Sequence, residues 1–317
     1  TSFFHPDINS AGTLVASRMR MHFDIWKYPT EGSPEENVRQ AVRITQQTGE
    51  VQTPSVSPGD REMVYLSDSG GHGNLWVKNL ENGDSRQITF EQDPNVSVGV
   101  PVWSPDGKNI SYVKRVPGNF DAESWLISPD GSNQRKVEDR DGWAAWSGDG
   151  RWLYYGATNQ GIWQLKKVSM NGGASIVIRP ENLQAPAIAP DGSALYFTKY
   201  YANVNGSTDQ EIQVARPENG PAQVIARISG SRIPAWQLIH PVISPDGKWL
   251  AMPLSDEGVT NIWVLPTSGG LFKQITDFDK RRTFIARRVS WSYDGKFLYA
   301  ALGEGDSDIV LLRGLLR

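Results

Sequence analysis

Short apolar runs separated by polar turns recur along the whole chain, and the clearest copy lies at residues 102–112. There the pair Val102-Trp103 is followed by Ser104-Pro105-Asp106-Gly107 and then by a stretch in which apolar and polar residues alternate. Alternation with a period of two is the pattern of a half-buried strand, and Pro, Asp and Gly each favour one position of a tight turn. This stretch therefore predicts a β-hairpin.

The same hairpin pattern occurs seven times along the chain. The six other copies turn at Asn9-Ser10-Ala11-Gly12, Ser57-Pro58-Gly59-Asp60, Ser147-Gly148-Asp149-Gly150, Ala189-Pro190-Asp191-Gly192, Ser244-Pro245-Asp246-Gly247 and Ser292-Tyr293-Asp294-Gly295. Successive turns end 48, 47, 43, 42, 55 and 48 residues apart. A period of about 47 residues falls in the range of β-propeller blades, which contain four strands each.

Each hairpin is followed by the marks of two more strands. In the second copy these are Asn74-Leu75-Trp76, the turn Asn82-Gly83 and Arg86-Gln87-Ile88-Thr89. A two-residue turn with Gly between apolar runs is typical of a hairpin connection. We therefore predict an all-β fold in which residues 1–317 form a single domain, a seven-bladed β-propeller of four-stranded antiparallel blades. The blades would start near residues 5, 53, 100, 143, 185, 240 and 288, and no segment shows helical periodicity.

The last copy is shorter than the others, because only five residues follow Ile309-Val310-Leu311-Leu312. Its fourth strand is therefore missing, whereas Thr1-Ser2-Phe3-Phe4 precedes the first copy. Closing the ring would remove the exposed strand edges that invite aggregation. We predict that the N-terminal strand at residues 1–4 completes the seventh blade. The alternative is a disordered tail.

The repeats resemble those of a known family. The Ser-Pro-Asp-Gly-Lys hairpins, followed by Ser67-Asp68-Ser69-Gly70 and Asn74-Leu75-Trp76-Val77, resemble the PD40 (WD40-like) repeats of TolB-like propellers, which also occur in the noncatalytic domain of prolyl oligopeptidases. Residues 35–45 and 307–312 are similar to C-terminal propellers of bacterial serine/threonine kinases and winged-helix regulators. The resemblance implies a noncatalytic ligand- or protein-binding module, a sensor or scaffold domain of a larger bacterial protein. It also implies a periplasmic or extracytoplasmic location, with the cytoplasm left open.

Composition narrows the classes of partner. The chain has 32 Lys and Arg against 35 Asp and Glu, so no overall charge favours nucleic acid. No apolar run approaches the roughly 20 residues that cross a bilayer, so we predict no membrane insertion. The absence of Cys removes disulfides, thiolate metal sites and Cys nucleophiles. We expect a monomer without a cofactor.

The turns also place candidate binding residues. Seven residues before each turn's end, where the innermost strand should meet the channel mouth, stand His5, Thr53, Val100, Trp143, Ala185, His240 and Arg288. His5, His240 and Arg288 would be neighbours in a closed ring, and Arg20, His22 and Arg287 extend this basic arc. Guanidinium groups pair well with carboxylates and phosphates, so the arc predicts a small anionic ligand. The alternative is a solvated rim with Arg281, Arg282 and Arg288 paired to Asp277 and Asp279.

Two further readings stay open. Trp143, Trp236, Phe120, Tyr200 and Tyr201 could form a stacking surface for a carbohydrate, peptide or protein partner, or could pack between blades. An enzyme with its active site at the channel mouth, such as a polysaccharide lyase or glycoside hydrolase, is the alternative function, although no linear catalytic motif is present. The oxygen-rich stretch at residues 203–211 only loosely resembles a calcium loop, and we predict no metal site.

Overall fold

The computed structural model describes residues 2–8, 13–47, 49–116, 122–141, 143–159, 161–202, 208–234 and 239–312. Within these residues it is an all-β propeller with six blades around a central channel. The predicted propeller of four-stranded antiparallel blades is present, but the predicted number of seven blades is wrong.

The first five blades follow one another along the chain, and each runs from an inner to an outer strand. Blade 1 consists of β4 (Val51–Val56), β5 (Glu62–Ser67), β6 (Asn74–Asn79) and β7 (Ser85–Gln87). Blade 2 consists of β8 (Ser97–Trp103), β9 (Ile110–Arg115), β10 (Ala122–Ile127) and β11 (Arg135–Asp141). Blade 3 consists of β12 (Ala145–Trp146), β13 (Trp152–Asn159), β14 (Ile162–Ser169) and β15 (Ile176–Arg179). Blade 4 consists of β16 (Leu183–Ile188), β17 (Leu195–Ala202), β18 (Thr208–Ala215) and β19 (Ala222–Ile228), and the short 3₁₀ helix η1 (Gly230–Arg232) follows it. Blade 5 consists of β20 (Val242–Ile243), β21 (Trp249–Asp256), β22 (Val259–Pro266) and β23 (Lys273–Gln274).

Both ends of the chain build blade 6. Its two inner strands are β25 (Ser290–Trp291) and β26 (Phe297–Leu312), and its two outer strands are β2 (Leu14–Pro29) and β3 (Val42–Arg43). The first and the last sequence copies are therefore two halves of one blade. The count of seven was wrong because each half carries the marks of a blade, while the turn assigned to Asn9-Ser10-Ala11-Gly12 lies outside the described residues.

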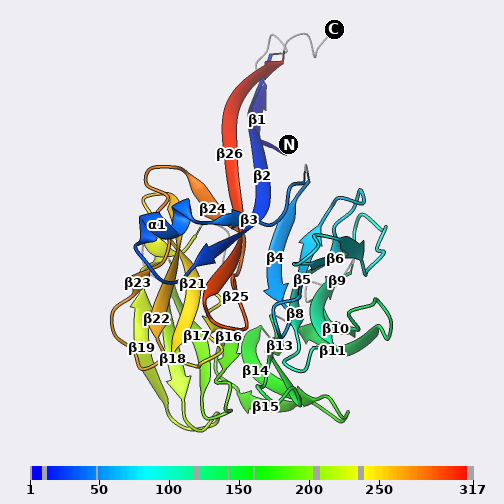
Figure 1. Ribbon diagram of the computed structural model, residues 1–317, viewed down its shortest axis with the longest axis vertical. Helices are drawn as coiled ribbons and strands as arrows, with labels where there is room; N and C mark the ends of the chain where they lie inside the picture. The colour runs from blue at the N-terminus through cyan, green and yellow to red at the C-terminus, as the bar shows by residue number, and fades with distance from the viewer. Residues whose placement is uncertain are drawn as a thin grey trace.

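Residues 2–4 do not complete a blade, contrary to the prediction. They belong to β1 (Ser2–Ile8), which pairs with β2 at the far end from the blade. The outer parts of β2 and β26 extend beyond the propeller together with β1, as the arm at the top of Figure 1. A further strand, β24 (Thr283–Ile285), pairs with β26 where the arm leaves the blade. The N-terminal segment does close the ring, but it does so with β2 and β3.

The connection between β2 and β3 contains a short helix that the sequence reading missed. Helix α1 (Pro34–Arg39) begins with a capping box in which Ser33 and Glu36 bond each other's backbone N–H. The run Ser-Pro-Glu-Glu is the known signal for such a start. The side chain of buried Asn37 donates to the Ile275 carbonyl (2.9 Å) in blade 5. The helix therefore ties the closing blade to its neighbour.

The Ser-Pro-Asp-Gly turns share one hydrogen-bond pattern. In blade 2 the Ser104 hydroxyl donates to Asp106 (2.6 Å) and accepts from the Asn109 N–H (2.9 Å). Gly107 has φ of 71°, which glycine adopts without strain. The Ser–Asp bond recurs in the turns of blades 3, 5 and 6. The hairpins expected at these turns are present.

Apolar side chains fill the spaces between neighbouring blades. Between blades 1 and 2, for example, Val64 and Leu75 pack with Trp103 and Ile110. Tryptophan indoles add hydrogen bonds across two such boundaries: Trp146 donates to the Val102 carbonyl (3.2 Å), and Trp291 donates to the Val242 carbonyl (2.9 Å). These contacts fix the inner strands around the channel.

Candidate site on the propeller axis

Irregular backbone marks the start of the inner strands. Thr53, Val100 and Ala185 have φ between 49° and 52°, and the strand register shifts at the same three places. A β-bulge of this kind turns side chains away from the regular alternation. The opposite end of the inner strands carries the Ser-Pro-Asp-Gly turns, so the bulges lie at the loop end of the channel.

Side chains from three blades meet at this loop end. The indole of Trp143, which precedes blade 3, stacks on the imidazole of His240, which precedes blade 5, with ring centroids 3.5 Å apart and planes 8° apart. The guanidinium of Arg287, at the start of blade 6, lies 5.7 Å from the Trp143 ring centroid. Blades 3, 5 and 6 are not all neighbours in the ring, so these contacts cross the axis. We call Trp143, His240, Arg287, Arg288 and Arg115 the axial cluster.

Burial and positive charge determine the protonation of the axial cluster. Burial holds the pKa of His240 well below its usual range, and the charges of Arg288 and Arg287 act in the same direction. Burial also lowers the pKa of Arg288 to about 10. Neighbouring protein atoms partly desolvate the guanidinium of Arg287, although its side chain as a whole is exposed. This desolvation and the charge of Arg115 lower the pKa of Arg287, while Glu50 opposes them. His240 is therefore neutral, and the arginines stay charged at neutral pH.

Several polar atoms of this region lack partners within the described residues. No ion pair is found there for Arg115, Arg287 or Arg288. Three buried polar atoms have no hydrogen-bond partner in the same part of the chain: His240 Nε2, Arg288 Nε and Thr53 Oγ1. A buried polar group without a partner costs about 1–3 kcal/mol. The cluster therefore combines surplus positive charge with unused hydrogen-bonding capacity.

The channel itself is a cavity of about 910 Å³. Inner strands of all six blades line it, and so do the Ser-Pro-Asp-Gly turns of blades 2, 5 and 6. Arg288 is the member of the axial cluster that lines the cavity. The cavity is thus reached from the turn face, whereas Arg287 is exposed at the loop end.

The other predicted binding residues do not join this cluster. His5 in β1 and Arg20 in β2 lie on the arm, and their side chains are outside the described part of the structure, as is Trp236. His22 hydrogen-bonds to Asp24 (2.7 Å) in blade 6, and Arg43 pairs with the same carboxylate. Tyr200 is half-buried in blade 4; it bonds Thr198 (3.2 Å), and burial raises its pKa to about 12. The arc that would join His5 to His240 and Arg288 depended on a first blade that does not exist.

The predicted solvated rim is not formed as expected. Arg281 pairs with Glu304 (3.3 Å), and the Asp277 carboxylate accepts from the Asp279 N–H (2.8 Å). No pair between these arginines and aspartates occurs in the residues that the structure describes. Arg115 is a charged neighbour that the sequence reading missed, because it ends the second strand of blade 2, far in sequence from the other members.

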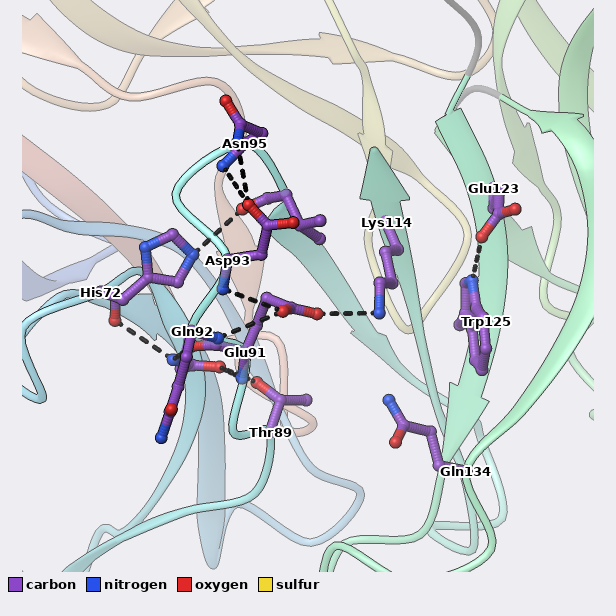
Figure 2. A network of polar contacts seen from close by, with 12 residues as sticks. His72, Thr89, Glu91, Gln92, Asp93, Asn95, Lys114, Glu123, Trp125 and Gln134 are labelled. Atoms are coloured by element: carbon purple, nitrogen blue, oxygen red, sulfur yellow. Dashed lines mark hydrogen bonds and ion pairs between the residues drawn. The ribbon is translucent and has the colours of Figure 1, made fainter. Parts of the chain in front are cut away.

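A polar network on the loop side orders the long connection between blades 1 and 2. Figure 2 shows Glu91 paired with Lys114 (2.8 Å) and bonded to the N–H groups of Gln92 and Asp93. The bond from Lys114 is the main reason why the pKa of Glu91 is lowered. The ring of His72 bonds the Val96 carbonyl (3.0 Å) nearby. Because these groups satisfy one another, the network explains loop order and needs no ligand.

Among the described residues, no group of three His, Cys, Asp or Glu side chains could hold a metal ion. The calcium-like stretch at residues 203–211 lies largely outside them. In the same described part of the chain, no helix has the length and hydropathy to cross a bilayer.

Comparisons with known proteins identify the fold. No protein-family model matches the chain. It is 26% identical over 200 residues to uncharacterized protein Atu1656 of Agrobacterium fabrum, a match covering 61% of either chain, so it spans less than two thirds of that relative.

Solved structures resemble it over most of its length. A structure from Agrobacterium tumefaciens described as a TolB has a TM-score of 0.68 at 17% identity and covers 90% of this chain and 99% of its own. TolB from Acinetobacter baumannii has a TM-score of 0.61 at 13% identity, covering 90% and 66%. Oligogalacturonate lyase from Vibrio parahaemolyticus has a TM-score of 0.54 at 13% identity, covering 90% and 98%. The chain therefore has the fold of TolB-like β-propellers. The likeness to kinase and regulator propellers stays a prediction.

Proposed function

We propose that this propeller is a noncatalytic binding module that recognises an anionic group at the loop end of its channel. The axial cluster carries the proposal, because Arg287 and Arg115 bring like charges together and Glu50 offsets this only in part. The charges of Arg287 and Arg288 also act on neutral His240. A ligand carboxylate or phosphate would relieve this repulsion and pair with guanidinium groups. We further propose an extracytoplasmic location, on the resemblance to TolB-like repeats alone.

Trp143 gives the site a second recognition element. Its ring stacks on His240 and also lies within cation–π distance of the guanidinium of Arg287, and both contacts hold it in place. A fixed indole beside cations suits an anionic sugar or an acidic peptide that also offers an apolar face. The described geometry favours binding over proton transfer, because a histidine whose pKa is far below neutral takes up a proton poorly.

A thermal-shift series tests this function. Citrate, inorganic phosphate, oligogalacturonate and an oligoglutamate peptide are compared with neutral oligomannose. We expect at least one anion to raise the melting temperature of the native protein, because a ligand that binds only the folded state stabilises it. Arg287→Gln should remove this rise, while the control Arg282→Gln, an exposed arginine of the same connection, should keep it. If no anion has an effect, or if Arg287→Gln retains the full rise, the proposal is wrong.

An enzyme remains a second candidate, because oligogalacturonate lyases share the fold. The unpartnered Nε2 of His240 beside Arg288 is the described feature that would serve such chemistry. Incubating the protein with oligogalacturonate and following the ultraviolet absorbance of an unsaturated product distinguishes the two. We expect binding without product. If product forms steadily and His240→Gln abolishes its formation, the protein is a lyase and the proposal of a noncatalytic binding module is wrong.

A further inference from the structure

The central channel is a second site, on the opposite face from the proposed anion site. Its cavity of about 910 Å³ is open at the turns and is lined by Arg288 at the other end of the inner strands. Arg288 stands seven residues before Gly295, the end of the blade 6 turn. Residues 292–295 form the turn itself, so about four residues of extended chain, roughly 13 Å, separate Arg288 from the turn. A ligand that reaches from the turns to Arg288 must therefore extend along the inner strands.

The loop end of the channel is covered by side chains. The stacked rings of Trp143 and His240 lie across the axis there, and His240 is only 5% exposed. Neither residue lines the cavity, and neither does Arg287. The channel is thus a pocket that a ligand enters from the turn face.

Charge is distributed unevenly along this pocket. At the turns, Asp246 and Asp294 each have a lysine partner, Lys248 at 3.4 Å and Lys296 at 3.9 Å. Arg288 has no ion-pair partner among the described residues, and its Nε is buried without a hydrogen bond. One uncompensated positive charge therefore lies at the inner end, where water is scarce and pairing with an anion is stronger than at a surface.

The walls between these ends mix apolar and polar residues. Val102, Ala145, Ala187 and Val242 line the pocket beside the hydroxyl-bearing Ser55, Ser244 and Ser290 and the tryptophans Trp103, Trp146, Trp249 and Trp291. Such walls suit a flat body that has an apolar face and hydrogen-bonding edges. Arg288 is the least exposed charged residue of the lining, because Glu31, Asp246, Lys273 and Asp294 are all exposed.

We propose that this pocket binds an elongated organic acid, with one carboxylate at Arg288 and a flat, partly apolar body between the inner strands. The ligand enters at the Ser-Pro-Asp-Gly turns with its carboxylate first. This site does not depend on the loop-end function, since only Arg288 could serve both.

Biphenylcarboxylate and its neutral carboxamide provide a matched pair of probes. We expect the native protein to bind the carboxylate about tenfold more tightly than the amide in calorimetry, because a charge-assisted bond is stronger than a neutral one. Binding should also quench tryptophan fluorescence, since four tryptophans line the pocket. Arg288→Gln should make the two affinities equal, and Arg288→Lys should keep part of the preference.

Two further variants locate the site. Ala145→Phe narrows the pocket at a half-buried wall position and should weaken both probes. Arg287→Gln should leave both affinities unchanged while it removes the loop-end response, so the failures of the two proposals are distinguishable. Circular dichroism and melting confirm that each variant folds. Absence of binding by the native protein, equal affinities for the two probes, full carboxylate preference in folded Arg288→Gln, or unchanged affinities in folded Ala145→Phe would overturn the proposal.

Discussion

His240 is a neutral base beside the cations Arg287 and Arg288. It has these neighbours because it lies just before the inner strand of blade 5, at the loop end of the channel. Counting back from the turns placed His240, Trp143 and Arg288 near the channel mouth, and the structure brings Trp143 and His240 into contact. The same count failed for His5, since its blade does not exist. Nothing in the sequence could show that Trp143 and Arg287 reach across the axis, because that contact depends on the number of blades.

Acid should destabilise the protein through His240. Its pKa is lowered by burial in the folded state and is about 6.5 in the unfolded chain. The unfolded state therefore binds a proton first as the pH falls, and stability decreases below about pH 6.5. Melting temperatures between pH 7.5 and 5.5 should fall less steeply in His240→Gln than in the native protein. An identical pH dependence in both would show that another group is responsible.

At the scale of the element, one polar motif joins the third and fourth strands of several blades. In blade 5 the Thr276 hydroxyl donates to Asn261 (3.1 Å) and accepts from the Ile262 N–H (2.9 Å). Thr89 with Asn74 and Thr45 with Asp24 form the same bonds in blades 1 and 6. The sequence marked Asn74-Leu75-Trp76 as part of a strand, but the bonds between these Asn or Asp residues and their threonine partners were visible only in the structure.

Thr276→Val tests this motif. The substitution keeps the shape of a fully buried side chain but leaves Asn261 and the Ile262 N–H without a partner. We expect a loss of about 2 kcal/mol in the free energy of unfolding, measured in urea. Thr276→Ser retains the hydroxyl and should lose clearly less. Equal losses would indicate that the methyl group, not the hydroxyl, matters.

At the scale of the molecule, the period and the turns of the sequence were sufficient to predict a propeller. They were insufficient to count its blades, because a half-blade at each end carries the same strand and turn signals as a whole one. The ring closes where Asp60 accepts hydrogen bonds from the backbone of Tyr293 (2.7 Å) and Asp294 (3.3 Å), between blades 1 and 6. The blade 1 turn ends in Gly59-Asp60, whereas the other turns of this type end in Asp-Gly. In this reversed order the Asp60 carboxylate bonds the neighbouring turn of blade 6.

Two truncations distinguish the arm from the closing strands. Deleting residues 1–8 removes β1, which pairs only with the arm, so the melting temperature should change little. Deleting residues 1–45 removes β2 and β3, exposes the edge of β26 and should abolish cooperative melting. Calorimetry of the two proteins beside the full chain decides this. A sharp loss from the shorter deletion would restore the view that the first residues close the ring.

The pairing of β2 with β26 also determines how the ring responds to mechanical force. The strands are antiparallel, so their outer ends, Leu14 and Leu312, are partners at the same end of the ladder. Tension applied to these two ends would load one residue pair at a time, as in a zipper, rather than all pairs together in shear. The arm would peel first, and the propeller would open only when peeling reached Trp26, where β3 joins the sheet.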